Sequence, residues 1–541
     1  MTTTADRALA GQATAPRRAL AWLTARQVLR GTILVALTAA GMSAIVAGQY
    51  EAAFADALDT GALRALAENP SIRVLFGTPL ALDDPGGFTV WRTGTPISVL
   101  GAVWALLAAT RITRGEEDAG RWDLLLAGRV RMVDLVAQCI LTLVAAAAVI
   151  GMAVGIALIV TGTDAAGALV HGIGVFGSAL VFATVGLLAA QLLPFRAAAA
   201  GVTGGVVGMC LLLRMLADGV TELSWIAWIT PFGLTARAAP YAGNRYQPLL
   251  VLVGGGVLLA IATLAAARTR DLGGAMIVPA ATRPPRRRLL GSLSAFAVRR
   301  ARSTTTAWAV GVGAYFLLIG ALISAIIEFL DKNARFADLA ATAGFAGLNS
   351  ATGFAAAMFS LLTIPAGLFA VTRLETMAAD EKARHWTALY ALPISRNRLL
   401  GNEIAVTATA VALLLVTAAV AMWTGAALTG APLSIGAALA GALNAAPIAW
   451  LALGAAAVAL GWYPPAVGAI GALPVVGGFL LNVVDHSVPV PSWLATLSPF
   501  AHLAAVPHTP PDWTASGALT ATAIALTALG LLGYQRRDLD T

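Results

Sequence analysis

"VDLVAQCILTLVAAAAVIGMAVGIALIVT" (residues 133–161) carries one charged residue, Asp134, at its start and then runs apolar to its end. About 20 apolar residues in an α-helix cross a hydrocarbon core of about 30 Å, so this stretch is long enough to span a membrane. Strands of a membrane barrel would instead alternate apolar and polar residues over about ten positions. The continuous run of Ala, Val, Leu, Ile and Gly therefore predicts a transmembrane helix.

Eleven further segments share this apolar character. They lie near 31–49, 95–113, 165–193, 197–217, 248–267, 306–328, 353–372, 404–429, 433–461, 466–484 and 515–535. Hydrophobic residues make up 58% of the 541 residues, more than is usual for a water-soluble protein. The sequence predicts an all-α polytopic membrane protein with twelve transmembrane helices.

The distribution of basic residues predicts how these helices are oriented. With the N-terminus inside, eight of the 35 basic residues fall on or near the outer side, which leaves 35 − 8 = 27 inside. The eight are Arg64, Arg73, Arg92, Arg214, Arg237, Arg245, Lys332 and Arg335. An excess of Lys and Arg marks the cytoplasmic side. We expect a multi-pass protein of the inner (plasma) membrane with both termini in the cytoplasm.

Three pairs of similar segments indicate an internal duplication. A shift of 264 residues aligns "EDAGRWDLLLAGRVR" (117–131) with "EKARHWTALYALPIS" (381–395). Shifts of 268 and 266 align "SWIAWITPF" (224–232) with "SWLATLSPF" (492–500), and "GGFTVW" (86–91) with "TGFAAA" (352–357). The sequence therefore predicts two parallel six-helix repeats. Their boundaries are 1–280 for the first half, 281–305 for a basic cytoplasmic connector and 306–541 for the second half.

The first of these pairs is unusually charged for this chain. Both copies, 116–131 and 380–396, fall on the predicted cytoplasmic side between the second and third spans of their halves. Charges at the bilayer centre cost about 2.5–3.5 kcal/mol each on insertion scales, so the segments lie outside the lipid. A solvated loop is one interpretation. The helical spacing of Trp122, Leu125 and Leu126, with a Trp repeated in the second copy, favours a short amphipathic helix that docks a partner.

Sequence motifs for catalysis are missing. A nucleotide-binding P-loop needs a lysine after its glycines, and the two lysines, Lys332 and Lys382, follow no such loop. Arg214 and Asp218, four residues apart, predict an ion pair on one helix face, structural rather than substrate-binding. His171 is interpreted as a packing residue rather than a proton relay. We expect no metal site, because Asp485, His486, His502 and His508 match no ligand spacing, and no nucleic-acid partner.

The charged segment resembles a known family. Glu117, Gly120, Arg121, the leucines 124–126 and Ala127 form a pattern similar to the coupling-helix region of ABC permeases that export drugs and polysaccharides. The wider stretches "LDDPGGFTVWRTG" (82–94) and "WALLAATRITRGEEDAGRWDLLLAGR" (104–129) resemble actinobacterial permeases for polyketide antibiotics, the tetronasin-type exporters. The resemblance covers the whole chain. The second copy departs from the pattern, with Arg384 in place of Gly120.

This resemblance implies a membrane subunit powered by a separate ATPase, bound in two copies, that would carry the ATP and Mg²⁺; the chain would have no nucleotide site or cofactor of its own. The complex would be an ATP-hydrolysing translocase exporting hydrophobic drugs or antibiotics. Two alternatives stay open: a proton-coupled multidrug antiporter, and a non-transporting membrane sensor or assembly protein. The residues expected to couple to the ATPase are Glu117, Gly120, Arg121, Trp122, Leu125, Glu381, Arg384, Trp386 and Leu389. We expect Trp122, Leu125, Trp386 and Leu389 to insert into an apolar cleft on it.

Parallel repeats place substrate sites at the repeat interface. The predicted path is lined by the second and fifth spans and their counterparts, although most candidates could equally be core residues. They are Trp104, Leu107, Met209, Leu213, Phe354, Met358, Phe359 and Leu362. The outer segments 51–92, 218–247, 329–351 and 485–514 are long and predominantly acidic, which predicts a cap favouring cationic or neutral amphiphiles.

Overall fold

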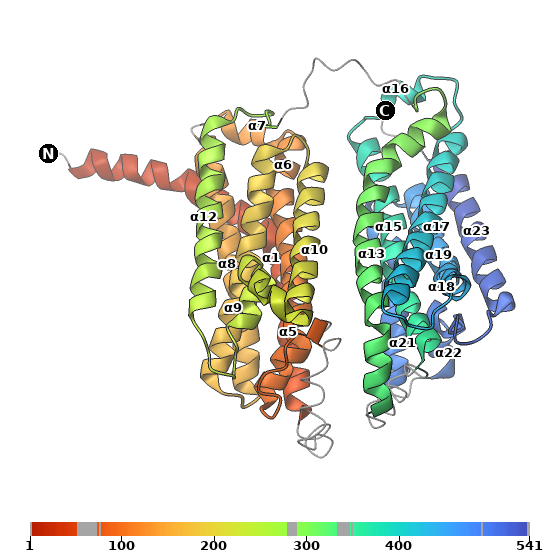
Figure 1. The fold of residues 1–541 in the computed structure, drawn as a ribbon. Helices are drawn as coiled ribbons and strands as arrows, with labels where there is room; N and C mark the ends of the chain where they lie inside the picture. Colours follow the sequence, from red (N-terminus) through yellow and green to blue (C-terminus); the bar gives the residue numbers. More distant parts are fainter. Residues whose placement is uncertain are drawn as a thin grey trace. The chain divides into compact units, whose positions relative to one another are not determined.

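The computed structural model describes residues 3–50, 73–74, 77–128, 130–277, 289–332, 347, 350–487 and 491–537 (Figure 1). The described residues form helices and turns, with no β-strand among them. Twelve helical segments are long and apolar enough to cross a membrane. The chain is an all-α polytopic membrane protein, as its hydropathy predicts.

The chain divides into two compact units, Met1–Arg283 and Pro284–Thr541. The spans of the first unit are α1 (Thr3–Gly48), α5 (Pro85–Ile112), α8 (Met132–Val160), α9 (Ala165–Leu192), α10 (Arg196–Gly219) and α12 (Gln247–Thr269). Those of the second are α13 (Leu293–Lys332), α15 (Ala351–Lys382), α17 (Arg396–Leu428), α18 with α19 (Ile435–Leu443 and Ala446–Trp462), the series α20 to α21, and α23 (Trp513–Arg536). Each unit thus carries six spans.

Local sequence sets the helix starts. Asp84 caps α5 by accepting hydrogen bonds from the backbone N–H groups of Gly86 and Gly87, and Pro85 occupies the first helical position. Asp164 caps α9 and Ser350 caps α15 in the same way. These side chains satisfy N–H groups that have no partner within the helix. The sharp starts of the spans therefore follow from the residues that precede them.

Two elements differ from expectation. α13 begins at Leu293, so residues 293–305 of the predicted connector are helical, and the basic run 283–288 lies outside the described residues. The fifth span of the second unit is not one helix. It consists of α20 (Val467–Ala472), a π-helical turn (Leu473–Gly477) and α21 (Gly478–Ser487). Pro474 lacks a backbone N–H, so the regular hydrogen-bond ladder cannot continue through it.

The fourth span is the most buried of each unit, together with α5 and α15 beside it. Small residues allow close packing around it. A Cβ built on Gly151 of α8 would lie 2.5 Å from the carbonyl oxygen of Gly172 in α9. In the second unit a Cβ on Gly461 of α19 would lie 2.3 Å from the carbonyl oxygen of Gly530 in α23. Lipid tails are as apolar as leucine, so such tight contacts hold membrane helices together where the hydrophobic effect does not.

Candidate functional site

The first charged segment folds as two short helices joined by a glycine. α6 (Arg114–Asp118) follows the second span, and α7 (Arg121–Leu126) begins after Gly120, whose φ is +70°. Arg121 donates from Nε and Nη2 to the two carboxylate oxygens of Glu116, both at 2.6 Å. This bond raises the pKa of the Arg121 guanidinium, which stays charged at the exposed surface. The segment is an ordered helical element and not an extended loop.

The second charged segment repeats this backbone. α15 ends at Lys382, and Arg384 takes the left-handed conformation of Gly120 with a φ of +59°. Its N–H donates to the carbonyl oxygen of Glu381 at 2.9 Å, as the N–H of Gly120 does to that of Glu117 at 2.9 Å. The short helix α16 (Thr387–Tyr390) then follows Trp386. The shift of 264 residues thus relates two equivalent turns, one of which holds an arginine in a conformation that favours glycine.

The tryptophans of both segments point inward. Trp122 is 2% exposed in a cluster with Ile112, Leu135 and Cys139 of its own unit. Trp386 is 3% exposed; it meets Phe296 edge to face, and the Arg300 guanidinium lies 4.4 Å from its ring centre. The expectation that these two side chains insert into a partner is therefore wrong in this conformation.

Other residues of the segments face outward. Arg121, Asp123 and Leu124 are exposed, Leu124 by 80%, and Leu125 is half-buried. In the second segment Arg384 and His385 are exposed and Leu389 is half-buried. Sequence spacing did not distinguish Leu124 from its neighbours, because three leucines in a row cover more than one face of a helix.

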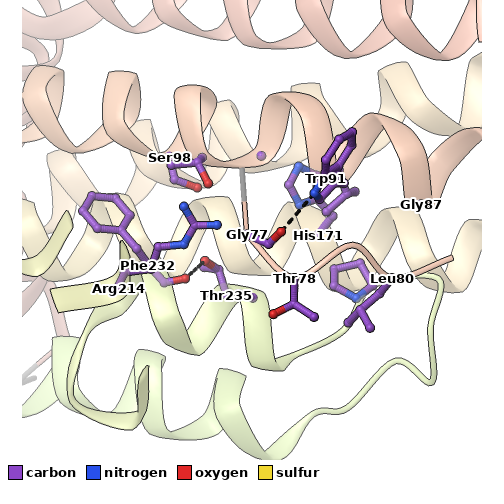
Figure 2. Close-up of a pocket in the computed structure, with 15 residues that line it drawn as sticks. Gly77, Thr78, Leu80, Gly87, Trp91, Ser98, His171, Arg214, Phe232 and Thr235 are labelled. Atoms are coloured by element: carbon purple, nitrogen blue, oxygen red, sulfur yellow. Dashed lines mark hydrogen bonds between the residues drawn. The ribbon is translucent and has the colours of Figure 1, made fainter. Parts of the chain in front are cut away.

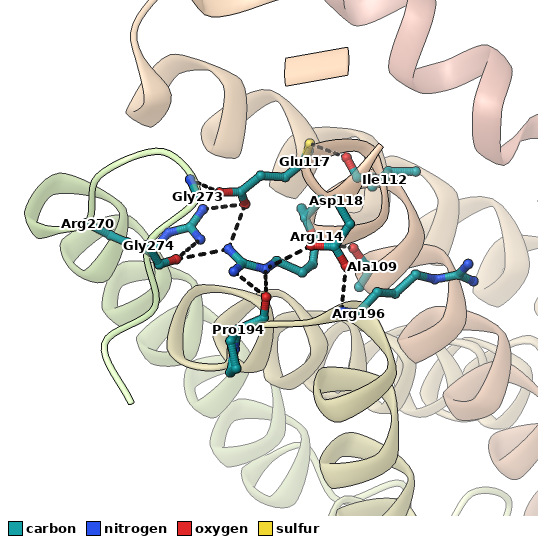
Figure 3. Close-up of polar contacts among 12 residues, drawn as sticks. Ala109, Ile112, Arg114, Glu117, Asp118, Pro194, Arg196, Arg270, Gly273 and Gly274 are labelled. Atoms are coloured by element: carbon teal, nitrogen blue, oxygen red, sulfur yellow. Dashed lines mark hydrogen bonds and ion pairs between the residues drawn. The ribbon is translucent and has the colours of Figure 1, made fainter. Parts of the chain in front are cut away.

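Glu117 connects the first segment to the rest of its unit (Figure 3). Its Oε2 accepts from Nη2 of Arg270 at 2.7 Å and lies 3.0 Å from Nη1 of Arg114, while Oε1 accepts from the Gly273 N–H at 2.8 Å. Arg114 also donates to the Pro194 carbonyl, 2.8 Å from Nε, and to that of Gly274. Arg270 is the C-cap residue that directly follows α12. The segment is thereby tied to the sixth span and to the turn between the fourth and fifth.

The second unit has the corresponding link. Glu381 pairs with Arg537, the C-cap residue that directly follows α23, the sixth span of this unit. Arg537 also donates from Nη1 to the carbonyl oxygen of Leu460 at 2.7 Å, and Arg396 donates to the Arg537 carbonyl oxygen at 2.6 Å. We name the Glu117–Arg270 and Glu381–Arg537 pairs the anchor pairs. Sequence analysis missed the two arginines, although the motif Arg-Asp-Leu follows the sixth span in both halves, at 270–272 and 537–539.

A second buried network is confined to the second unit. Glu403 accepts from Nη1 of Arg300 at 2.7 Å and from Nη2 of Arg373 at 2.9 Å, and Arg300 also pairs with Asp380. A shift of 264 places Cys139 opposite Glu403 and Ala109 opposite Arg373. Both lie in the apolar cluster around Trp122. The repeats thus share the anchor pairs and differ in what surrounds each tryptophan.

Arg214 and Asp218 come together at the opposite, predicted outer end of the first unit. Arg214 Nε lies 2.6 Å from Asp218 Oδ2, and both side chains are buried. The arginine lines a cavity of about 70 Å³ with His171, Trp91, Ser98 and Phe232 (Figure 2). A Cβ on Gly77 would lie 2.0 Å from Arg214 Nη2, so only glycine leaves room for the guanidinium there.

The candidate path residues fall into different environments. Phe354, Phe359 and Leu362 are buried in the second unit, where Phe359 stacks on Phe316 with ring centres 5.7 Å apart. Leu107 and Met209 are exposed. Trp104, Leu213 and Met358 are half-buried. A path between the halves stays a prediction, and Leu107 and Met209 are the members with free surface in their own unit.

Comparison with known proteins adds to this geometry. Residues 290–535 match the family model described as the multidrug efflux system permease Rv1217c, C-terminal domain. The chain is 28% identical over 485 residues to the multidrug efflux system permease protein Rv1217c of Mycobacterium tuberculosis (strain ATCC 25618 / H37Rv). The aligned region covers 88% of this chain and 86% of that protein. The match to the family model lies within the second unit. In sequence, this twelve-span protein is similar along most of its length to a multidrug efflux system permease.

Proposed function

We propose that the chain is the membrane subunit of an ABC exporter for hydrophobic drugs or antibiotics, of the tetronasin-type group. In this proposal two copies of a separate ATPase subunit bind ATP and Mg²⁺ on the cytoplasmic side of the plasma membrane. Support comes from the similarity to a multidrug efflux permease and from the twelve spans in two units. The two charged segments are the docking elements for the ATPase.

The anchor pairs are the observation that carries this proposal. A docking element transmits force only if it is fixed to the helices that must move. Glu117 and Glu381, each in its own unit, tie a charged segment to the end of a sixth span. The Glu117 and Arg270 side chains are 4% and 2% exposed, so the first bond is shielded from competing water. A displacement of α6 and α7 would therefore move α12 and the turn at Pro194 with them.

This arrangement separates two roles along the first segment. Arg121, Asp123 and Leu124 present the surface that contacts the ATPase, since they are exposed. Glu117, Arg114 and Trp122 lie beneath that surface and hold it to the unit. Closure of the ATPase dimer would push on the exposed residues. The buried residues would pass this movement to the spans and shift the unit between two helix packings.

The test distinguishes docking from transmission. Arg121→Glu should weaken co-purification of the ATPase, because it reverses an exposed charge. Glu117→Gln should leave the ATPase bound and lower drug-stimulated ATP hydrolysis by about tenfold, which corresponds to 1.4 kcal/mol of lost coupling. Arg131→Gln is the matched control. It removes an exposed arginine at the end of the segment, beyond α7, one that pairs with Asp134 in the first turn of α8.

Native coupling in both the Arg121 and the Glu117 variants, with the control also native, would show that the segments do not couple the ATPase to the spans. Transport that follows the proton gradient with no ATPase present would instead identify an antiporter. A chain that binds neither an ATPase nor a drug would support the sensor alternative. Each readout uses the full-length chain reconstituted in lipid.

A further inference from the structure

The cavity beside Arg214 is built from parts of the first unit that are far apart in sequence (Figure 2). Trp91 and Ser98 come from α5, His171 from α9 and Arg214 from α10. Phe232 comes from the short helix α11 (Pro231–Arg237). The tryptophan donates from Nε1 to the carbonyl oxygen of Gly77 at 3.0 Å and thereby fixes the loop that closes one side. The walls are largely apolar, with a few polar groups converging on them, as in small-molecule sites.

One lining residue, His171, carries a buried polar atom that has no partner among the described residues. His171 is 5% exposed, and its buried Nε2 atom makes no hydrogen bond to any described residue. Leaving such a group unsatisfied costs about 1–3 kcal/mol, so a ligand that bonds to it would bind more tightly. The buried hydroxyl of Ser98 lines the same space.

Arginine side chains gather at this end of the unit. Arg73, Arg214 and Arg237 all act electrostatically on Asp218. The outer segments are acidic in total and predict cationic or neutral amphiphiles, whereas Arg214 contributes a guanidinium to the cavity wall. A buried guanidinium among apolar walls favours a carboxylate or phosphate.

The size of the cavity limits what can enter. A volume of about 70 Å³ accepts a headgroup and a few carbon atoms, whereas sites for whole drug-sized ligands measure about 300–1,000 Å³. Thr78 and Leu80 line the cavity and are exposed, so they form its open rim. An apolar chain attached to the headgroup can extend out of the cavity over the exposed side chain of Leu80.

We propose that this cavity binds the anionic headgroup, carboxylate or phosphate, of an amphiphile whose apolar chain extends over Leu80. The amphiphile is either a soluble compound or an anionic phospholipid of the outer leaflet. The corresponding positions of the second unit carry different residues. Shifts of 266 and 268 place Ala357 opposite Trp91 and Asn482 opposite Arg214. The proposed site therefore belongs to the first unit.

The test measures binding directly and does not involve the ATPase. The purified full-length chain in phosphatidylcholine nanodiscs is titrated with radiolabelled dodecanoate, with empty discs as background. We expect saturable binding that unlabelled dodecanoate displaces and methyl dodecanoate does not. Displacement by phosphatidylglycerol built into the discs would assign the site to a lipid headgroup, and its absence would assign it to a soluble amphiphile.

Two sets of variants locate the binding. The double variant Arg214→Gln with Asp218→Asn removes both charges of the ion pair, so that neither is left without its partner. It should weaken the binding of dodecanoate at least about tenfold. Arg245→Gln, which removes an exposed arginine from the same predicted face, should bind as the native chain does.

Leu80→Asp tests the site without touching its buried groups. The substitution lies at the exposed rim, where folding tolerates it. Its negative charge should repel the anionic ligand and lower the affinity for dodecanoate about tenfold, whereas Leu80→Asn should leave the affinity unchanged. Equal competition by the methyl ester, or native binding by both the double variant and Leu80→Asp, would overturn the proposal. Native ATPase coupling in the Arg121→Glu and Glu117→Gln variants, with dodecanoate binding intact, would count against the proposed function alone.

Discussion

The anchor pair of the first unit is open to a double-mutant cycle. Glu117 bonds to Arg270 at 2.7 Å and to the Gly273 N–H at 2.8 Å, and it lies 3.0 Å from Arg114. Removing one partner of a buried ion pair costs about 3–5 kcal/mol, because the other charge is left without compensation. Arg114 keeps Asp118 at 3.3 Å and the Pro194 carbonyl at 2.8 Å, so we expect the lower end of this range for Glu117→Gln, about 3 kcal/mol.

Arg270→Gln should cost less, about 1.5–3 kcal/mol, since Glu117 retains Arg114. The double variant should be more stable than the sum of the single changes by at least about 1 kcal/mol. The free energy of unfolding is measured in mixed micelles by denaturant titration followed by circular dichroism, with Asp123→Asn as an exposed control. A coupling energy below about 0.5 kcal/mol would refute the idea that the pair holds the segment to α12.

Further substitutions probe the two turns, the helix packing and one hydrogen bond between tyrosines. Gly120→Ala should destabilise the chain by about 1 kcal/mol and Arg384→Gly should stabilise it by a similar amount, because both positions have positive φ; equal unfolding midpoints for both variants and the native chain would contradict this. Gly425→Leu should cost about 3 kcal/mol or prevent folding, since its Cβ would lie 2.1 Å from a backbone oxygen of α13; normal yield and stability would disprove the contact. Tyr534→Phe should cost about 1 kcal/mol through its 2.8 Å hydrogen bond to Tyr390, and a double variant with Tyr390→Phe that loses the full sum of the two single changes would contradict this shared bond.

The spans were predictable because hydropathy is a local property. The apolar run 133–161 became α8, Met132–Val160, and the run 165–193 became α9, Ala165–Leu192. A helix satisfies its backbone hydrogen bonds within its own length, so in lipid an apolar stretch needs no distant partner to choose this conformation. Two spans of the second unit are exceptions. The fourth is divided into α18 and α19. In the fifth, Pro474 interrupts the helix; the residue is visible in the sequence, but the π-helical turn around it is not.

The candidate site was predictable only in part. The repeated charged segments and the Arg214–Asp218 spacing are visible in the sequence, and the structure brings the latter pair together. Sequence spacing did not show that Trp122 faces inward and Leu124 outward. The arginine partners of Glu117 and Glu381 lie 153 and 156 positions away. A repeated Arg-Asp-Leu motif marked them, although nothing local indicated their role.

The sequence by itself determined which segments are long and apolar enough to span a membrane, which segments resemble one another, and which are charged, because each of these can be read from the residues in order. Tertiary structure alone decided which side of the charged segment is buried, which arginine anchors each glutamate, and which residues share the cavity at Arg214. Those outcomes depend on how helices pack against one another. Burial and ion pairing are properties of neighbours in space, and helix packing brings together residues that the sequence keeps more than one hundred positions apart.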